Sequence, residues 1–250
     1  MVDILIKLIG WRATLVQAAP IVTDRWNWLR RYLRPGPLST LDVGCGAGEM
    51  SLYAAQQGNS VTGLSYDEYL NQIGRSRAEI LRLPNVRFVT ADARQLRAAF
   101  APDERFQQII CLEMIEHILD DDRLIADLAH LLAPDGRLLL TTPNKNGYRK
   151  PGATLSQVED GGHVRWGYTH AELRALLTKH GLKVVAEDYV SGCVSQFITR
   201  LMEVENRYLR YLAWALTFSF RLIIALDSLI TKLLRFPYLS VGVVAEKSQS

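Results

Sequence analysis

Three glycines that alternate with other residues follow a short apolar run. The segment reads Leu41-Asp42-Val43-Gly44-Cys45-Gly46-Ala47-Gly48-Glu49. The apolar run predicts a buried strand, and the residues after the glycines predict a helix. Glycine lets a chain turn sharply, and it lets a ligand approach the backbone without meeting a Cβ. Because open α/β sheets bind nucleotides at this kind of turn, the segment predicts a nucleotide or nucleoside site.

The spacing of the glycines separates several classes of nucleotide. A dinucleotide-binding turn has a third glycine at the sixth position of GxGxxG, where this chain has Glu49. The Lys-Ser/Thr pair of a P-loop is also missing. A carboxylate at Asp42 would repel phosphates and attract an ammonium group. The pattern favours a nucleoside without a pyrophosphate, although a bare GxGxG also occurs in ordinary tight turns.

Side chains that could move a proton occur in two other segments. Glu113, Glu116 and His117 follow a predicted strand, and His163 lies in the glycine-rich and aromatic segment 160–168. Loops at this edge of an α/β sheet carry function, and histidine is the usual base near neutral pH. We take His163, His117 and Glu113 as the candidate catalytic residues.

These residues also have purely structural interpretations. His117 can bond to backbone at a helix start, and Trp166 and Tyr168 can simply pack the loop. Cys45 and Cys111 are typical of small buried residues rather than nucleophiles. The three cysteines of the chain are far apart without a CxxC spacing, so we expect no metal site, no disulfide framework and a reducing cytoplasm.

The elements that would position these residues alternate between strands and helices. The predicted strands are 38–43, 60–64, 86–90, 108–112, 137–142, 182–190 and 239–245; the predicted helices are 49–57, 69–81, 119–132 and 169–179. Such alternation implies right-handed crossovers and a sheet buried on both faces. We therefore predict an α/β fold with a doubly wound, mostly parallel, Rossmann-like sheet of seven strands.

Four segments in order resemble the class I S-adenosylmethionine-dependent methyltransferases, in particular the small-molecule branch that includes ubiquinone-biosynthesis O-methyltransferases. They are LDVGCGAGEM (41–50), VTADARQL (89–96), CLEMIEHI (111–118) and LLAPDGRLLLTTPN (131–144). The resemblance covers about 38–190 and the final strand. It implies that the cofactor is S-adenosyl-L-methionine, which leaves as S-adenosyl-L-homocysteine.

The resemblance also implies roles for individual positions. The first segment would cradle the methionine end of the cofactor, and Asp92 would hold the adenine amino group. The cofactor-binding residues expected in this way are Asp42, Gly44, Cys45, Gly46, Gly48, Ser65, Tyr66, Asp92, Ala93, Leu112 and Glu113.

One position departs from the pattern of those enzymes. Their second strand usually ends with an acidic residue that accepts both ribose hydroxyls, whereas this chain has Ser65. A serine replaces two charge-assisted hydrogen bonds by one, which costs roughly 1–3 kcal/mol of binding unless Asp67 or Glu68 reaches the ribose.

The composition fits an enzyme with one core. The chain has 250 residues, 48% of them hydrophobic, and a net charge of +3 with no run of five or six like charges, which argues against a nucleic-acid partner. Asp3, Lys7 and Arg12 interrupt the apolar start, which favours an amphipathic helix with the stripe Ile4, Leu5, Leu8, Ile9 and Leu15 over a signal peptide.

A long apolar helical stretch, 196–236, separates the last two strands. Its longest uncharged run is too short for the ~20 residues of a membrane span. It could be a lid over the site, a homodimer surface, or a face on a membrane with Arg207, Arg210, Arg221, Lys232 and Arg235 toward headgroups. Together with Trp26, Trp28 and Tyr32 it suggests a lipophilic acceptor.

We therefore predict a cytoplasmic enzyme, with peripheral membrane contact as an option, that methylates a small, lipophilic acceptor at a hydroxyl. The alternatives are an N- or C-methyltransferase of the same fold and a non-catalytic binding protein that retains the fold. The predicted organisation is an N-terminal helical cap (1–37), a cofactor-binding domain (38–195 and 237–250) and a helical insertion (196–236).

Overall fold

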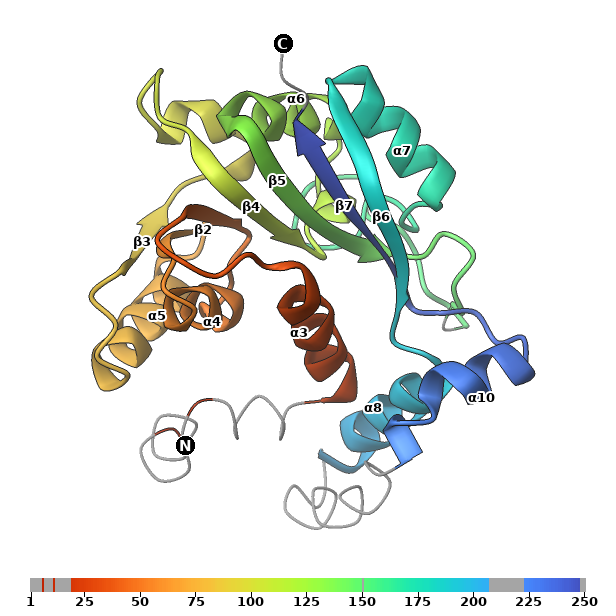
Figure 1. Ribbon diagram of the computed structural model, residues 1–250. Helices are drawn as coiled ribbons and strands as arrows, with labels where there is room; N and C mark the ends of the chain where they lie inside the picture. The colour runs from red at the N-terminus through yellow and green to blue at the C-terminus, as the bar shows by residue number, and fades with distance from the viewer. Residues whose placement is uncertain (1–5, 7–10, 12–18, 150, 207–222, 248–250) are drawn as a thin grey trace.

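A computed structural model describes residues 6, 11, 19–149, 151–206 and 223–247. Its centre is a seven-stranded sheet in the order β3-β2-β1-β4-β5-β7-β6 (Figure 1). The strands are β1 (Ser39–Val43), β2 (Ser60–Ser65), β3 (Val86–Thr90), β4 (Phe106–Leu112), β5 (Leu132–Pro143), β6 (Leu182–Val190) and β7 (Ser240–Lys247). Strand β7 runs antiparallel to both of its neighbours, β5 and β6, and the other paired strands are parallel. The predicted fold class is confirmed.

Helices cover both faces of the sheet. They are α3 (Pro20–Tyr32), α4 (Glu49–Gln56), α5 (Glu68–Ile80), α6 (Asp121–Leu131), α7 (His170–Lys179), α8 (Cys193–Asn206) and α10 (Asp227–Leu233), with the 3-10 turns η1 (Ala93–Ala99) and η2 (Ile115–His117). One apolar cluster joins the sheet to α6 and α7 through residues such as Leu128 and Leu177. A second joins it to α3, α4 and α5 through residues such as Trp26, Leu52 and Ala78.

Side-chain caps set where several helices begin. Asp67 accepts hydrogen bonds from the backbone N–H groups of Tyr69 and Leu70 at the start of α5. Thr169 and Glu172 form a capping box at the start of α7. Such caps satisfy the free N–H groups of the first turn. The caps and the strand pattern place these elements within a few residues of their predicted bounds.

Two bounds differ from the prediction for physical reasons. Strand β5 begins at Leu132 instead of 137, because Leu132 pairs with Phe106 before a register shift that absorbs the predicted turn. Helix α8 begins at Cys193 instead of 196. Asp227 of α10 accepts the N–H groups of Gly192 and Val194 at 3.0 and 2.9 Å, which caps α8 at this earlier point.

Helix α3 is fastened to the far edge of the sheet. The indole N–H of Trp28 and the hydroxyl of Tyr32 both donate to Asp188 of β6, at 3.2 and 2.6 Å. The Trp28 ring also occupies the space that a side chain at Gly242 of β7 would need. The aromatic residues of α3 therefore hold the helix on the sheet.

Three further predictions concern the N-terminal helix, the division of the chain into parts and membrane-spanning helices. The predicted N-terminal stripe lies outside the described residues, although Ile6 and Trp11 are buried. The three-part division of the chain stays a prediction. Among the helices that the structure describes, none combines the length and the apolar character that crossing a membrane requires.

Candidate functional site

The glycine turn joins β1 to α4 at the carboxyl end of β1. Gly44, Gly46 and Gly48 all have positive φ, between 55° and 84°. A Cβ at Gly48 would lie 2.7 Å from the ring of Phe88, so this glycine permits packing inside the protein. A Cβ at Gly46 would meet nothing closer than 4.0 Å. Gly46 therefore leaves its backbone open on one side, as a ligand cradle requires.

Asp42 lies at the base of this turn, on β1. Its side chain is buried and accepts a hydrogen bond of 2.6 Å from the hydroxyl of Ser51 on α4. Burial raises the pKa of Asp42 to about 7, against the opposing effect of the Ser51 hydrogen bond. Cys45, in the turn itself, is buried, and burial also raises the pKa of its thiol. A thiol of raised pKa is a poor nucleophile, as expected from the sequence.

The end of β2 has no carboxylate where the resemblance implies one, because position 65 is a serine. Ser65 is buried, and its hydroxyl accepts the N–H of Asp67. The Asp67 carboxylate caps α5, and Glu68 is bound to Arg75 and Thr90. Both carboxylate oxygens of Glu68 and Oδ1 of Asp67 are therefore engaged within the protein. Tyr66, by contrast, is 77% exposed and open to a ligand.

Asp92 follows β3 and begins η1, with Ala93 beside it. Its carboxylate accepts hydrogen bonds from the guanidinium of Arg94, at 2.9 and 2.7 Å from Nε, and these bonds hold its pKa below the usual range. Arg94 also reaches Glu159 at 3.3 Å. An adenine amino group at Asp92 would therefore share the carboxylate with Arg94.

Glu113 follows Leu112, the last residue of β4, in a left-handed backbone conformation with φ of 51°. Its Oε2 accepts hydrogen bonds from Arg25 of α3 at 3.0 Å and from Ser240 of β7 at 3.2 Å. Its Oε1 is buried and has no hydrogen-bond partner among the described residues. Such a left-handed non-glycine residue is strained and is typical of functional sites. Glu113 thus joins α3 to the strand ends where the reacting groups would meet.

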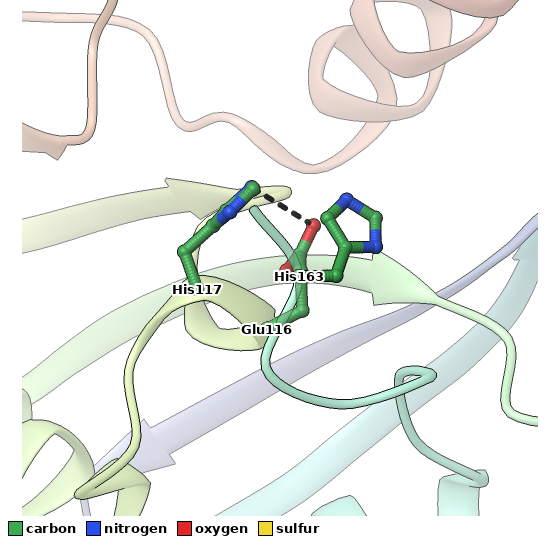
Figure 2. Close-up of side chains that lie close together, drawn as sticks. All are labelled: Glu116, His117 and His163. Carbon is green, nitrogen blue, oxygen red and sulfur yellow. Dashed lines mark ion pairs between the residues drawn. The ribbon is translucent and has the colours of Figure 1, made fainter. Parts of the chain in front are cut away.

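Three further side chains, those of Glu116, His117 and His163, lie close together (Figure 2). Glu116 and His117 come from η2, and His163 comes from the loop between β5 and α7. One potential ligand atom from each lies within 4.8 Å of the others. The two imidazole rings meet edge to face, with centroids 4.8 Å apart. The structure brings together His117 and His163, which the sequence analysis selected independently.

Backbone contacts carry His163 to this place. The N–H of Val164 donates to the carbonyl of Glu116 at 2.9 Å. The guanidinium of Arg165 donates to the carbonyls of Ile118 and Leu119, and it pairs with Asp121. The loop is therefore fixed onto the segment that follows β4, and the position of His163 depends on the two residues that follow it, Val164 and Arg165.

The hydrogen bonds determine which nitrogen of His117 can react. Its Nδ1 lies 3.0 Å from the carbonyl oxygen of Gly162, which can only accept, so Nδ1 carries the proton. The lone pair of the neutral ring is then on Nε2, which lies 3.9 Å from the Glu116 carboxylate. Burial and the adjacent His117 lower the pKa of His163. The unprotonated Nε2 of His117 and the ring of His163 are thus the groups of this cluster that can accept a proton.

Glu116 is the most buried member of the group. Its Oε2 accepts a hydrogen bond of 3.0 Å from the hydroxyl of Thr142 on β5. Burial and the neighbouring Glu113 raise its pKa. One carboxylate and two imidazoles form a donor set that divalent transition metals accept. The expectation that the chain has no metal site therefore stays a prediction.

Two partners of Glu113, Arg25 and Ser240, were missed by sequence reasoning. Arg25 lies on a helix that precedes the glycine turn, and Ser240 begins the last strand. Nothing in their local patterns signals a contact with position 113. The aromatic residues Trp26, Trp28 and Tyr32 were interpreted as signs of a lipophilic acceptor. They pack α3 onto the rest of the fold, so they do not support that inference.

The comparisons with known proteins agree with this arrangement. Residues 21–187 match a protein family described as a methyltransferase domain. A ubiquinone biosynthesis O-methyltransferase of Stutzerimonas stutzeri is 35% identical over 127 residues, which are 49% of this chain and 51% of that protein. A protein of the same name from Coxiella burnetii is 37% identical over 106 residues, 42% of this chain and 44% of that protein. The chain spans about half the length of the curated relatives it matches.

Solved structures share the fold. An S-adenosylmethionine-dependent methyltransferase from Mesorhizobium loti has a TM-score of 0.60 at 18% identity, covering 90% of this chain and 98% of that one. The cyclase SpnF has a TM-score of 0.61 at 22% identity, covering 90% of this chain and 80% of that one. Because the family match covers the glycine turn, the β4 motif and the histidine loop together, this chain belongs to the methyltransferase domain family.

Proposed function

We propose that this protein transfers the methyl group of S-adenosyl-L-methionine to a hydroxyl group of a small, lipophilic acceptor. The observation that carries the proposal is the pair of histidines beside the carboxyl ends of β4 and β5, with Nδ1 of His117 already committed to a carbonyl. A hydroxyl must lose its proton on methylation, and this pair offers an acceptor for it. The relatives named as O-methyltransferases support the choice of oxygen.

The residues of the glycine turn fit the cofactor. The open space at Gly46 leaves room for the methionine end of S-adenosyl-L-methionine, and Asp42 places a titratable carboxyl near its ammonium group. Tyr66 is exposed toward the adenosine end, and Asp92 would share its carboxylate between the adenine amino group and Arg94. When bound, the cofactor supplies a methyl group on a positively charged sulfur. The remaining task of the protein is to align the acceptor oxygen with that methyl and to exclude water.

Two histidines then share the proton step. Transfer of that methyl group to a hydroxyl oxygen would release S-adenosyl-L-homocysteine and the proton of the hydroxyl, which needs a base in the site. The acceptor proton passes to one imidazole of the pair, at Nε2 of His117 or at His163, and the edge-to-face contact with the other ring holds that imidazole in place. Glu113 and Arg25 close the site from the side of α3 and orient the acceptor.

A second role for the same cluster is the binding of a divalent cation by Glu116, His117 and His163. The hydrogen bond from Nδ1 of His117 to a backbone carbonyl is the support that metal-binding histidines usually have. A cation would lower the pKa of an acceptor hydroxyl directly. Because Glu116 must lose its proton to bind a metal, the affinity for the cation would rise with pH.

The test is a turnover assay with hydroxylated aromatic acceptors that carry alkyl tails of increasing length. We expect a methyl ether as product, formation of S-adenosyl-L-homocysteine, and kcat/KM that rises with tail length because each buried methylene contributes about 0.8 kcal/mol. His117→Ala and His163→Ala should each lower kcat by about 100-fold or more while the Kd of S-adenosyl-L-homocysteine stays unchanged. His180→Ala is the matched control, because His180 binds Asp122 outside the cluster.

The outcomes separate the alternatives. Methylation of an amine or carbon would indicate an N- or C-methyltransferase, and cofactor binding without turnover of any acceptor would indicate a binding protein. Loss of turnover after chelation, restored by a divalent cation, would assign the cluster to the metal role. Full activity of both histidine variants would overturn the proposed base.

A further inference from the structure

Exposed leucines gather on one side of α10. Leu226, Leu229, Leu233 and Leu234 are 53–80% exposed, and Ile223 just before them is 40% exposed. We call the four leucines the leucine face. The other exposed aliphatic side chains of the described residues, Leu119, Val158 and Val185, do not belong to α8 or α10. Contiguous exposed apolar surface of this kind marks an interaction site, whereas scattered residues do not.

The opposite side of α10 is fixed to the protein. Asp227 and Thr231, one turn apart, are buried, and they accept backbone N–H groups at the start of α8: Asp227 from Gly192 at 3.0 Å and Thr231 from Cys193 at 2.8 Å. Leu229 and Leu233 follow each of them by two residues, which is about 200° around a helix. Because Asp227 and Thr231 are held against α8, Leu229 and Leu233 point away from α8.

The exposed charges around the leucine face are positive. Between 223 and 236 the cations are Lys232 and Arg235, and both are exposed. The only carboxylate in this range, Asp227, is buried and bound to the backbone of α8. An apolar face with cations at its border and its acid turned inward is complementary to a surface with an apolar interior and anionic headgroups.

The leucine face lies close along the chain to a residue that binds Glu113 of the candidate site. Helices α8 and α10 lie beyond the end of β6 and the start of β7, on the same side of the sheet as α3 (Figure 1). Ser240, the first residue of β7, binds Glu113. A surface bound by α10 would therefore lie on the side of the molecule where β7 begins and Glu113 is held.

We propose that the leucine face of α10, with Lys232 and Arg235, docks this protein on an anionic lipid surface. The apolar side chains enter the boundary between headgroups and acyl chains, and the two cations pair with lipid phosphates. The proposal is separate from the proposed function, since it concerns binding to lipid and not turnover.

The experiment measures partitioning of the full chain onto vesicles by co-sedimentation. Vesicles of phosphatidylcholine with phosphatidylglycerol are compared with vesicles of phosphatidylcholine alone, at low and high salt. We expect stronger binding to the anionic vesicles, and weaker binding as salt increases. Leu229→Ser with Leu233→Ser should lower the partition coefficient by about tenfold or more on both kinds of vesicle. Lys232→Gln with Arg235→Gln should lower it about tenfold, on anionic vesicles only.

Val185→Ser is the matched control, because it removes an exposed aliphatic side chain from β6 at a distance from α10 along the chain. It should bind vesicles as the unchanged protein does, and thermal melting checks that each variant is folded. Failure of the unchanged protein to bind anionic vesicles, or equal binding by the leucine variant, would overturn the proposal. A lipid-free dimer that the leucine variant converts to monomer would assign the face to a second copy of the chain instead.

Discussion

At the scale of single residues, the end of β2 differs from the enzymes that this chain resembles. In the enzymes that this chain resembles, an acidic residue there accepts both ribose hydroxyls. Here Ser65 offers one hydroxyl, which already accepts the N–H of Asp67, while Asp67 and Glu68 are engaged elsewhere. Weakened ribose recognition therefore stays a prediction, and Glu68 does not offset it because both of its carboxylate oxygens are engaged.

We predict that Ser65→Asp strengthens cofactor binding. A carboxylate would add a charge-assisted hydrogen bond to the ribose, and it could still accept the N–H of Asp67. Isothermal titration should show the Kd of S-adenosyl-L-homocysteine falling by about tenfold, which corresponds to about 1.4 kcal/mol. Ser65→Ala should change it by less than Ser65→Asp does, in the opposite direction. Unchanged or weaker binding by Ser65→Asp would show that the ribose lies elsewhere.

The sequence predicted part of the candidate site residue by residue. Asp42, the three glycines and Asp92 belong to local motifs, so their positions at strand ends follow from the pattern. His117 and His163 were selected separately, and their contact depends on the loop bonds of Val164 and Arg165. Arg25 and Ser240 reach Glu113 only through tertiary packing, which has no local signal in one sequence.

At the scale of elements, the glycine turn combines ligand access with internal packing. Gly46 faces open space, but Gly48 lies against Phe88 of β3. The same ring would meet a Cβ at Gly63 and at Gly74. Three glycines thus surround one aromatic side chain, and they allow β2, α4 and α5 to approach it closely.

We predict that Gly48→Ala destabilises the protein by about 2–4 kcal/mol, because it combines a left-handed backbone with overpacking against Phe88. Gly181→Ala should cost only about 1 kcal/mol, since φ there is also positive, at 74°, but no atom lies within 4 Å of the new Cβ. Urea unfolding of both variants measures the difference. Equal losses would mean that backbone strain alone explains the glycine at 48.

The strands and helices themselves were predictable because apolar runs, turn residues and caps agree along the chain. The antiparallel insertion of β7 between β5 and β6 has no signature in its own residues, since a buried strand has the same pattern in either direction. The early start of α8 depends on Asp227, 34 residues farther along the sequence than Cys193, and such a cap cannot be found locally.

At the scale of the whole molecule, buried acids link stability to pH. Asp42 has a pKa raised to about 7 by burial, and the pKa values of Glu116 and Asp24 are also raised by burial. The folded protein therefore holds protons that the unfolded chain releases above about pH 4. Their stabilising effect is complete below that pH and is lost as pH rises through the folded pKa values.

We predict that the free energy of unfolding of the ligand-free protein falls by about 2 kcal/mol or more between pH 5 and pH 8. Urea titrations at several pH values measure this slope. Asp42→Asn should flatten it, because the amide can still accept the Ser51 hydrogen bond and does not ionise. Stability that rises over this range would show that these acids are ionised at little cost.

The fold alone does not decide the reaction, since a cyclase shares it. The proposed function depends on one claim, that the turn from Gly44 to Gly48 holds the methionine end of S-adenosyl-L-methionine. The most direct test is isothermal titration of S-adenosyl-L-homocysteine into Gly46→Ala and Gly181→Ala, which share a left-handed backbone and open space around the new methyl group. We predict a Kd at least about tenfold higher for Gly46→Ala and an unchanged Kd for Gly181→Ala. Unchanged binding by Gly46→Ala would contradict the claim.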